Sequence, residues 1–465
     1  MSQTSLKRNF AYKSVLTVSN YLMAFITFPY VSRILGVERI GLVNFVDNTV
    51  NYFLLFASMG IGIFGVREIA AVKNEIGNRN IVYSRILGLN LQFTFGALIV
   101  YWAFIQLMPH LQEYKSLFYI GSAKILFTAF VIEWFYTGIE QFKYISLRNI
   151  LVKAIYVIAV FLFVRTTNDY TLYFILTVNV VVMNALINSL YARRYVHILK
   201  KEIFSLYYLK QNVSLGIYTI MTSMYLTFNV MFLGFVSNNI EVGYYTTAFK
   251  LYTVILSFFT AFTNVMLPRM SAIWASGNDY EFNRLIQKSI SLFCVFTFPI
   301  MAFGIVLAPQ IILLLSGRGY EGAILPMRII MPAIFFVGMA QILAVQILMP
   351  MKKDGVLLKA SIIGASISLL LNIFIVSSLH SIGTAIVLLV SECLVTLTYM
   401  CYVLTHKLVI FPIKKMFLSI INGVLIGILL YCVACYISFP LWTLVGGCII
   451  VGGNLFVIWK YAIRR

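Results

Sequence analysis

Apolar runs of roughly twenty residues recur along this chain from Tyr12 to Trp459. Each run is long enough, as a helix, to cross about 30 Å of hydrocarbon. The runs are continuous rather than alternating, which argues against the strands of a membrane barrel. Of the 465 residues, 61% are hydrophobic and 11% are charged, proportions that exclude a soluble globular chain. The sequence therefore predicts an all-α polytopic membrane protein.

We expect about 14 transmembrane helices, at residues 12–35, 40–66, 81–107, 117–138, 147–164, 172–192, 213–236, 244–266, 285–307, 325–349, 356–379, 383–404, 416–437 and 441–459. The first run has no small-residue cleavage site, so we expect it to stay in the mature chain. The six cysteines all lie inside apolar runs. Membrane packing explains the pair Cys432 and Cys435 better than a zinc site, which needs further ligands.

The basic residues predict the topology. All but eight of the 35 Lys and Arg residues fall on the same side of the membrane as the N-terminus. The eight on the other side are Arg33, Arg39, Lys115, Lys124, Arg165, Lys250, Arg318 and Arg328. Because Lys and Arg concentrate in cytoplasmic loops, we expect both termini in the cytoplasm. Orientation also accounts for the net charge of +20, so we expect no nucleic-acid partner.

The polar residues inside the spans reveal an internal repeat. Gly41 aligns with Gly243 and Arg67 with Arg269, an offset of 202 residues in both pairs. Polar residues of spans 1, 2, 7 and 8 follow a helical period of 3.6 and pair across this offset. We predict that twelve of them line a cavity: Asn20, Thr27, Asn44, Asn48, Asn51, Tyr218, Thr222, Tyr225, Asn229, Thr246, Thr253 and Ser257.

Two interpretations of these polar lanes stay open. Hydroxyls and amides that face lipid would lose hydrogen bonds at a cost in free energy, so the lanes should face water or other helices. They could form hydrogen bonds between helices. We favour the second interpretation, in which the lanes form the wall of a central cavity between two repeats.

Five segments carry a family resemblance that spans nearly the whole chain. They are Phe28 to Phe45, Trp134 to Lys153, Val242 to Leu251, Leu267 to Ser271 and Gln346 to Ala365. In this order they resemble the Wzx-type O-antigen and polysaccharide flippases, a branch of the multidrug/oligosaccharidyl-lipid/polysaccharide exporter superfamily.

The resemblance implies two six-helix lobes around a central cavity. These would be residues 1–192 and 213–404, joined by the cytoplasmic loop 193–212 and followed by a trailing helix pair at 405–465. It also implies a non-enzymatic flippase of the bacterial inner membrane. The substrate would be an undecaprenyl-pyrophosphate-linked oligosaccharide repeat unit, of O-antigen or another surface polysaccharide, moved from the cytoplasmic to the outer leaflet by alternating access.

The resemblance leaves several properties open. The sugar, the oligomeric state and the coupling to a proton or a sodium ion are among them. No cofactor is implied. Besides membrane lipids, a polysaccharide polymerase and a chain-length regulator are candidate partners.

A pyrophosphate that crosses a low-dielectric layer needs cations along its route. Lys250 is the foremost candidate because it lies on the polar lane of span 8, where a charge costs about 2.5 to 3.5 kcal/mol. An ion pair between Lys250 and Asp47 is an equally weighted alternative. Arg33 and Arg328 are further candidates for the anion path, although both could serve as anchors at the outer interface.

Lys124 and Glu133 are nine residues apart in span 4, which puts them on opposite faces of a continuous helix. We therefore assign Lys124 to the anion path. Glu133 and Glu392 are left as coupling groups or as partners in ion pairs or helix contacts. Pro29 predicts a bend in span 1, either a hinged gate or a static kink.

Two other function classes compete with a flippase. A membrane-embedded polysaccharide polymerase or acyltransferase is disfavoured because the outer loops are short and no histidine lies mid-membrane. The chain has no Walker-type glycine loop, which argues against an ATP-driven pump. A cation-coupled multidrug exporter of the same superfamily should favour carboxylates in its cavity, and the mixed signs of Lys250, Lys124 and Asp47 do not exclude it.

Overall fold

The computed structural model describes the backbone of residues 3–437 and 439–463. Side chains are described from residue 23 onward except at 24, 214–215, 218–219, 221–227, 261, 264, 459 and 461–463. Within this part of the chain every regular element is a helix, which confirms the predicted all-α fold. The chain divides into two compact units, Met1–Met231 and Phe232–Arg465.

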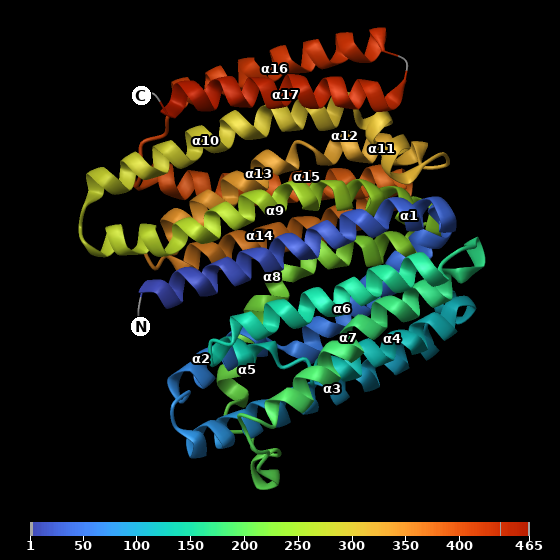
Figure 1. The fold of residues 1–465 in the computed structure, drawn as a ribbon, viewed down its shortest axis with the longest axis vertical. Helices are drawn as coiled ribbons and strands as arrows, with labels where there is room; N and C mark the ends of the chain where they lie inside the picture. The colour runs from blue at the N-terminus through green and yellow to red at the C-terminus, as the bar shows by residue number, and fades with distance from the viewer. Residues whose placement is uncertain (1–2, 438, 464–465) are drawn as a thin grey trace. The chain divides into compact units, whose positions relative to one another are not determined.

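Unit 1 contains the first seven α-helices and the start of the eighth (Figure 1). Their bounds are α1 Gln3–Ser58, α2 Ile61–Ala71, α3 Ile76–Leu107, α4 Lys115–Thr128, α5 Glu133–Gly138, α6 Phe142–Phe163, α7 Tyr170–Ala192 and α8 Leu209–Val236. Short 3₁₀ turns stand at Pro109–Tyr114, Thr167–Asp169 and Lys200–Glu202. Helix α1 packs against α3, α4 and α6.

Helix α1 is too long for one crossing. Its 56 residues would extend about 84 Å at 1.5 Å per residue, more than twice the thickness of the hydrocarbon layer. Gly36 breaks it with φ 73° and ψ 170°, a conformation that glycine adopts without a steric penalty. This break lies between the predicted spans 12–35 and 40–66. Pro29, the residue at which we predicted a bend, lies inside the helix.

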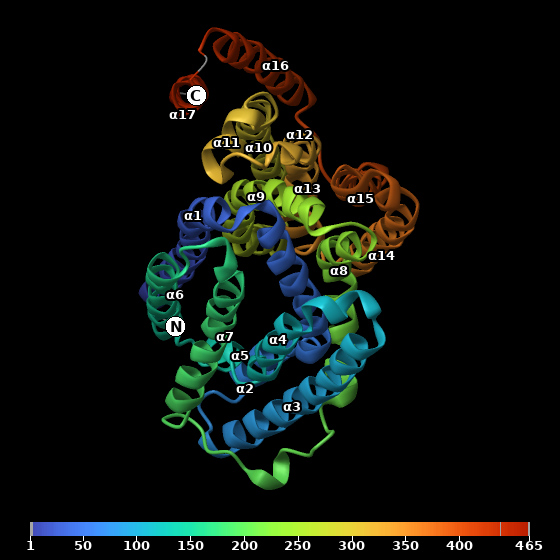
Figure 2. The ribbon, with the colours of Figure 1, turned by 90° about the vertical axis from the view of Figure 1, so that its right-hand side faces the viewer.

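Unit 2 holds the remaining helices. Their bounds are α9 Asn239–Ala275, α10 Asp279–Val306, α11 Ala308–Ser316, α12 Ile324–Ile330, α13 Ala333–Gln341, α14 Asp354–Leu371, α15 Ser377–Thr405, α16 Ile413–Tyr436 and α17 Pro440–Ile463. A 3₁₀ turn stands at Glu321–Ala323, and π-helical stretches stand at Ile342–Leu348 and Asn372–Val376. Helices α14 and α15 lie side by side, and α16 packs along α10 (Figure 2).

Helices α14 and α15 form a hairpin. The backbone turns at His380, which has φ 47° and ψ −122°. Gly364 precedes the turn and Val395 follows it. A Cβ at Gly364 would lie 2.5 Å from a methyl group of Val395. The two positions are almost equally far from His380, as expected when the second helix returns along the first.

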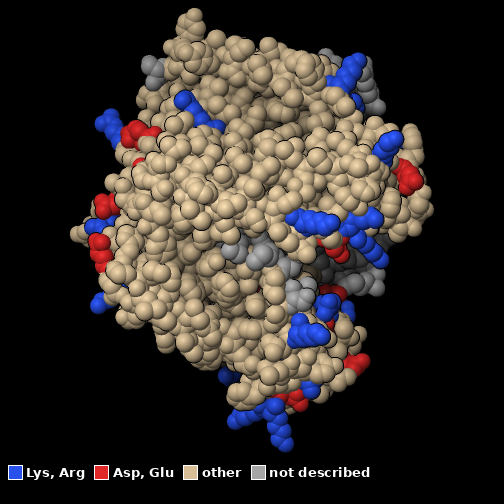
Figure 3. Space-filling view, turned by 180° about the vertical axis from the view of Figure 1, so that it is seen from behind, with Lys and Arg blue, Asp and Glu red and all other residues tan. Residues whose placement is uncertain are grey.

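The described residues contain 11 stretches that are long and apolar enough to cross a membrane. Two of them, Phe25–Ala71 and Asp354–Thr405, contain 47 and 52 residues and include the breaks at Gly36 and His380. If each of these two stretches crosses the membrane twice, the 11 stretches supply 13 crossings. Helix α8 then brings the total to the predicted 14. Large apolar side chains are exposed, such as Phe374 at 73% and Ile449 at 69%. Charged side chains are sparse on the face drawn in Figure 3. These features describe a multi-pass membrane protein.

The predicted inter-lobe loop 193–212 lies within unit 1. Arg85 of α3 forms an ion pair with Glu202 at 2.6 Å. Arg79, also in α3, donates a hydrogen bond to the carbonyl of Tyr195 at 2.7 Å. The loop is therefore attached to α3 by side-chain contacts. The lobe boundaries at 1–192 and 213–404 stay a prediction.

Candidate functional site

A largely buried ammonium group lies between α1 and α4 in unit 1. The Nζ of Lys124 donates to Oδ1 of Asp47 at 2.7 Å and to Oδ1 of Asn51 at 2.8 Å. The Nδ2 of Asn51 donates in turn to Oδ2 of Asp47 at 3.1 Å. The side chains of Lys124 and Asp47 are 14% and 29% exposed. The three groups form a closed triangle in which both carboxylate oxygens accept a hydrogen bond.

Gly121 explains why Lys124 reaches this triangle. A Cβ at Gly121 would lie 2.5 Å from a methyl group of Val50 and 3.2 Å from the hydroxyl of Tyr101. Helix α4 can approach α1 this closely only because Gly121 has no side chain. Lys124 is three residues further along and on the same helical face. The close approach therefore brings its ammonium group to Asp47.

Sequence reasoning placed Lys124 and Asp47 inside membrane spans but did not pair them with each other. The predicted partner of Asp47 was Lys250, which is half-buried on α9 in unit 2. That pairing would join the two units and stays a prediction. The ion pair of Asp47 within unit 1 is with Lys124.

The polar lane of α1 is half-buried at Asn44, Asn48 and Asn51. The amide of Asn44 donates to the carbonyl of Ile40 at 2.8 Å, and that of Asn48 to the carbonyl of Asn44 at 2.8 Å. Among the described lane residues, four hydroxyl groups also donate to carbonyls of their own helix; they belong to Thr27, Thr246, Thr253 and Ser257.

These intrahelical bonds matter for the interpretation of the lanes. Because the helix itself accepts the hydrogen bonds, the lanes do not need water to satisfy them. Asn229 is buried and also has a partner. The side chains of Asn20, Tyr218, Thr222 and Tyr225 lie outside the described residues. The lining of a cavity by these positions stays a prediction.

A second polar cluster surrounds Arg148 of α6, which sequence reasoning counted only among the basic residues on the cytoplasmic side. The side chain of Arg148 is 3% exposed and pairs with Glu133 at 2.5 Å. It also donates to the side-chain oxygen of Asn188 in α7. The hydroxyl of Tyr144 donates to the same oxygen at 3.0 Å, and the amide of Asn149 donates to Glu133 at 3.1 Å. Of the alternatives for Glu133, the structure shows an ion pair.

This cluster lies at a break in the fourth span. Helix α4 ends at Thr128, and α5 starts at Glu133 after Ile132, whose φ is 37°. The placement of Lys124 and Glu133 on opposite faces assumed one continuous helix, so that assumption is wrong. An Arg, an Asn and a Glu within apolar spans are the signal that could have revealed the cluster, because buried polar groups need partners.

Side chains of neighbouring helices cap the unwound stretch. The carbonyl of Ala129 accepts from Asn90 at 3.3 Å, and the carbonyl of Phe130 accepts from Ser189 at 3.5 Å. The carbonyl of Val131 accepts from Asn188. Irregular backbone inside a membrane protein is tolerated where such partners replace the missing helical bonds.

The remaining candidates lie apart from these clusters. Arg33 is exposed. Arg328 is exposed and donates to the carbonyl of Ile305 at 3.1 Å. Glu392 of α15 is 4% exposed. Its carboxyl group forms no ion pair or hydrogen bond within the described part of the chain.

Comparison with known proteins identifies the family. Residues 6–274 match the family described as polysaccharide biosynthesis protein, which is more than half of the chain. The chain belongs to this family. The resemblance seen in the sequence is thereby confirmed.

Two relatives of this polysaccharide biosynthesis family member carry the name "Putative O-antigen transporter". The one from Escherichia coli (strain K12) is 24% identical over 422 residues, which cover 88% of this chain and 99% of the relative. The one from Shigella dysenteriae is 26% identical over 403 residues, which cover 84% of this chain and 98% of the relative.

Solved structures show the same fold. A structure titled lipid II flippase MurJ, in an inward closed conformation, superposes with a TM-score of 0.78 and 15% identity. The match covers 98% of this chain and all of that one. An inward-facing multidrug resistance MATE family transporter of the MOP superfamily gives a TM-score of 0.59 and 14% identity, over 83% and 94% of the two chains. This polysaccharide biosynthesis family member therefore has the helical fold of these transporters.

Proposed function

We propose that this chain is a flippase that moves an undecaprenyl-pyrophosphate-linked oligosaccharide from the cytoplasmic to the outer leaflet of a bacterial inner membrane, by alternating access. The observation that carries the proposal is the ammonium group of Lys124, held inside a membrane-spanning unit by Asp47 and Asn51. The names of the two relatives support a lipid-linked sugar of the O-antigen class.

The triangle of Lys124, Asp47 and Asn51 suits a transient anion site. Without substrate, Asp47 neutralises Lys124, which lowers the cost of keeping a cation in the membrane. A pyrophosphate offers several charged oxygens and competes with the single carboxylate for the ammonium group. Lys124 then exchanges one anionic partner for another and is not left uncompensated. Lys250 serves as the corresponding cation of unit 2.

The rival function is a cation-coupled multidrug exporter. A chain that moves organic cations should present a free carboxylate to its cargo, whereas both oxygens of Asp47 are occupied by Lys124 and Asn51. The two relatives in sequence also carry the name of a sugar transporter rather than a drug exporter. Both observations favour the flippase.

Several finer points belong to the same proposal. Both termini lie in the cytoplasm, in agreement with the distribution of Lys and Arg. The chain performs no covalent chemistry. A polymerase and a chain-length regulator take up the translocated unit on the outer leaflet. Glu392, a buried carboxyl group without an ionic partner among the described residues, is the candidate for coupling to a proton or a sodium ion.

The test is complementation of a strain that lacks the gene. We expect the deletion to accumulate lipid-linked repeat units on the cytoplasmic leaflet and the native chain to clear them. Lys124→Ala and Lys250→Ala should fail, whereas Lys124→Arg and Lys250→Arg should restore part of the transport. Lys115→Ala is the matched control, because Lys115 is exposed and lies on the same helix as Lys124.

A second variant separates transport from folding. Lys124→Ala leaves Asp47 uncompensated, whereas Lys124→Ala combined with Asp47→Ala removes both charges. We expect the double variant to recover part of the stability that the single variant loses and still to fail in transport. Full transport by Lys124→Ala, or by the double variant, would remove this ammonium group from the mechanism.

A further inference from the structure

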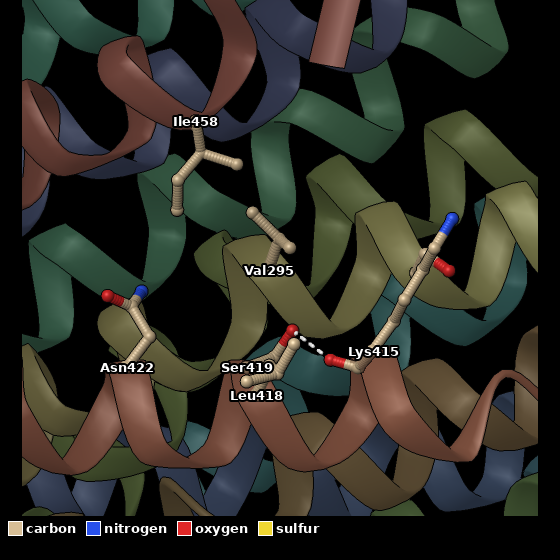
Figure 4. Close-up of a pocket in the computed structure, with 7 residues that line it drawn as sticks. Val295, Lys415, Leu418, Ser419, Asn422 and Ile458 are labelled. Carbon is tan, nitrogen blue, oxygen red and sulfur yellow. Dashed lines mark hydrogen bonds between the residues drawn. The ribbon is translucent and has the colours of Figure 1, made fainter. Parts of the chain in front are cut away.

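A groove runs between α10, α16 and α17 in unit 2, with a volume of about 250 Å³. Figure 4 shows Lys415 at one end and Asn422 at the other, with Val295 and Ile458 across from Leu418. The volume is below the roughly 300 to 1,000 Å³ of small-molecule pockets. A slender ligand fits a space of this size better than a bulky one.

The polar groups inside the groove are satisfied by the protein. Ser291 and Ser419 donate to the carbonyls one turn earlier in their own helices, at 2.6 and 2.8 Å. Asn422 and Asn454 exchange two hydrogen bonds of 3.0 Å. The groove therefore offers an incoming ligand its apolar side chains, and the ammonium group of Lys415 at its rim.

Contacts between the three helices set their register. A Cβ at Gly423 of α16 would meet Phe298 of α10 at 2.6 Å, and one at Gly427 would lie 3.6 Å from the methyl group of Ala302. Both pairs are 125 residues apart, so the two helices run parallel. Asn422 pairs with Asn454, and a Cβ at Gly446 would lie 3.4 Å from a methyl group of Val433, so α17 runs antiparallel to α16.

This register places three lysines at the same level, at one end of the groove. Lys288 of α10 is three residues before Ser291 and lies level with the first residues of α16. Lys460 of α17 lies level with the turn that contains Lys415. All three lysines are exposed. Within the described residues, none of them forms an ion pair with a carboxylate.

We infer that this groove binds an anionic glycerophospholipid. One acyl chain lies against Val295, Leu418 and Ile458, and the phosphate lies among Lys288, Lys415 and Lys460. Basic sites between transmembrane helices on the cytoplasmic side recognise anionic headgroups in this way. The distribution of Lys and Arg places this end of the three helices at the cytoplasmic surface. The lipid would fasten the trailing pair α16 and α17 to α10.

The experiment measures lipid binding to the purified, delipidated full chain. Native mass spectrometry counts bound phosphatidylglycerol and bound phosphatidylcholine, and thermal unfolding is followed with each lipid. We expect phosphatidylglycerol to bind and to raise the melting temperature, and phosphatidylcholine to bind at least tenfold more weakly. Replacing each lysine by glutamine should weaken phosphatidylglycerol binding roughly fivefold.

Two variants make the result specific to this groove. Val295→Trp should fill the apolar part and reduce binding without a change in charge. The triple variant Lys352→Gln, Lys353→Gln and Lys359→Gln removes three exposed lysines elsewhere in unit 2 and should bind like the native chain. Equal binding of the two lipids would overturn the inference. So would equal losses in this triple variant and in a chain that combines Lys288→Gln, Lys415→Gln and Lys460→Gln, or a preference for a polyprenyl phosphate over phosphatidylglycerol.

Discussion

The Nζ of Lys124 lies 2.7 Å from Oδ1 of Asp47, although 77 positions separate the two residues in the chain. Their helices meet because Gly121 allows α4 to touch α1 at Val50. A charge pair with this little exposure is stabilised mainly by its two partners. Removing either partner leaves the other charge without compensation.

We expect Lys124→Met and Asp47→Leu each to lower the free energy of unfolding by about 2 to 3 kcal/mol, below the value for fully buried pairs because both groups keep some exposure. The double variant should lose less than the sum of the two. Thermal unfolding in detergent provides the measurement, and the double-mutant cycle isolates the pair. Strictly additive losses would show that the two charges do not interact.

Gly121→Ala should disturb the same contact without removing a charge. The added methyl group would meet Val50 at 2.5 Å, and overpacking of this kind costs about 1 to 3 kcal/mol. Gly96→Ala in α3 is the control, because no atom lies within 4 Å of the Cβ that it adds. The melting temperatures of the two variants are compared. A Gly121→Ala chain as stable as Gly96→Ala would contradict the close packing of α1 and α4.

Asn188→Leu should destabilise the cluster around Arg148. It removes the acceptor for Arg148 and the donor to the carbonyl of Val131, and buried polar groups that lose a partner cost about 1 to 3 kcal/mol each. The expected loss therefore exceeds that of Ile187→Leu, a neighbouring change on the half-exposed face. Chemical denaturation in mild detergent measures both. Equal stability of the Asn188→Leu and Ile187→Leu chains would contradict this role of Asn188 in the cluster.

Cysteine labelling tests whether the polar lanes are wet. In a chain whose six native cysteines are replaced, Asn48→Cys should react with a water-soluble thiol reagent in membranes, and Val46→Cys, a buried position, should not. Cysteines introduced at Tyr218, Thr222 and Tyr225 in span 7 should react with the reagent as well. If Asn48→Cys is as inert as Val46→Cys, the lane is packed dry.

Glu392→Gln tests the coupling assigned to that carboxyl group. Glutamine keeps the size of the side chain but cannot ionise. The variant should fold normally and lose the stimulation of transport by a proton or sodium gradient. Gradient-dependent transport in vesicles measures this. A fully gradient-sensitive Glu392→Gln chain would assign the coupling elsewhere.

The helical class and the spans could be predicted because each depends on local apolar length. The break at Gly36 also fell where two apolar runs met. Pro29 lies inside α1, and the bend predicted there stays a prediction.

The pairings could not be predicted from one sequence. Lys124 and Asp47 come together through a contact at Gly121 that no local pattern shows. The break after Thr128 was also missed, because no proline or glycine marks residues 129–132. Its stability comes from Asn90, Asn188 and Ser189, which belong to two other helices.

Those capped carbonyls give α4 a fixed pivot. The carbonyls of residues 129–131 are tied to α3 and α7, so this end of α4 is held in place. Lys124 lies five residues before Ala129, so its backbone is about 7.5 Å along the helix axis from the capped break. A tilt of about 10° would carry its backbone about 1.3 Å, which is enough to lengthen a 2.7 Å hydrogen bond beyond bonding distance. A rotation of α4 of this size about the capped break, directed away from α1, would release the ammonium group from its carboxylate.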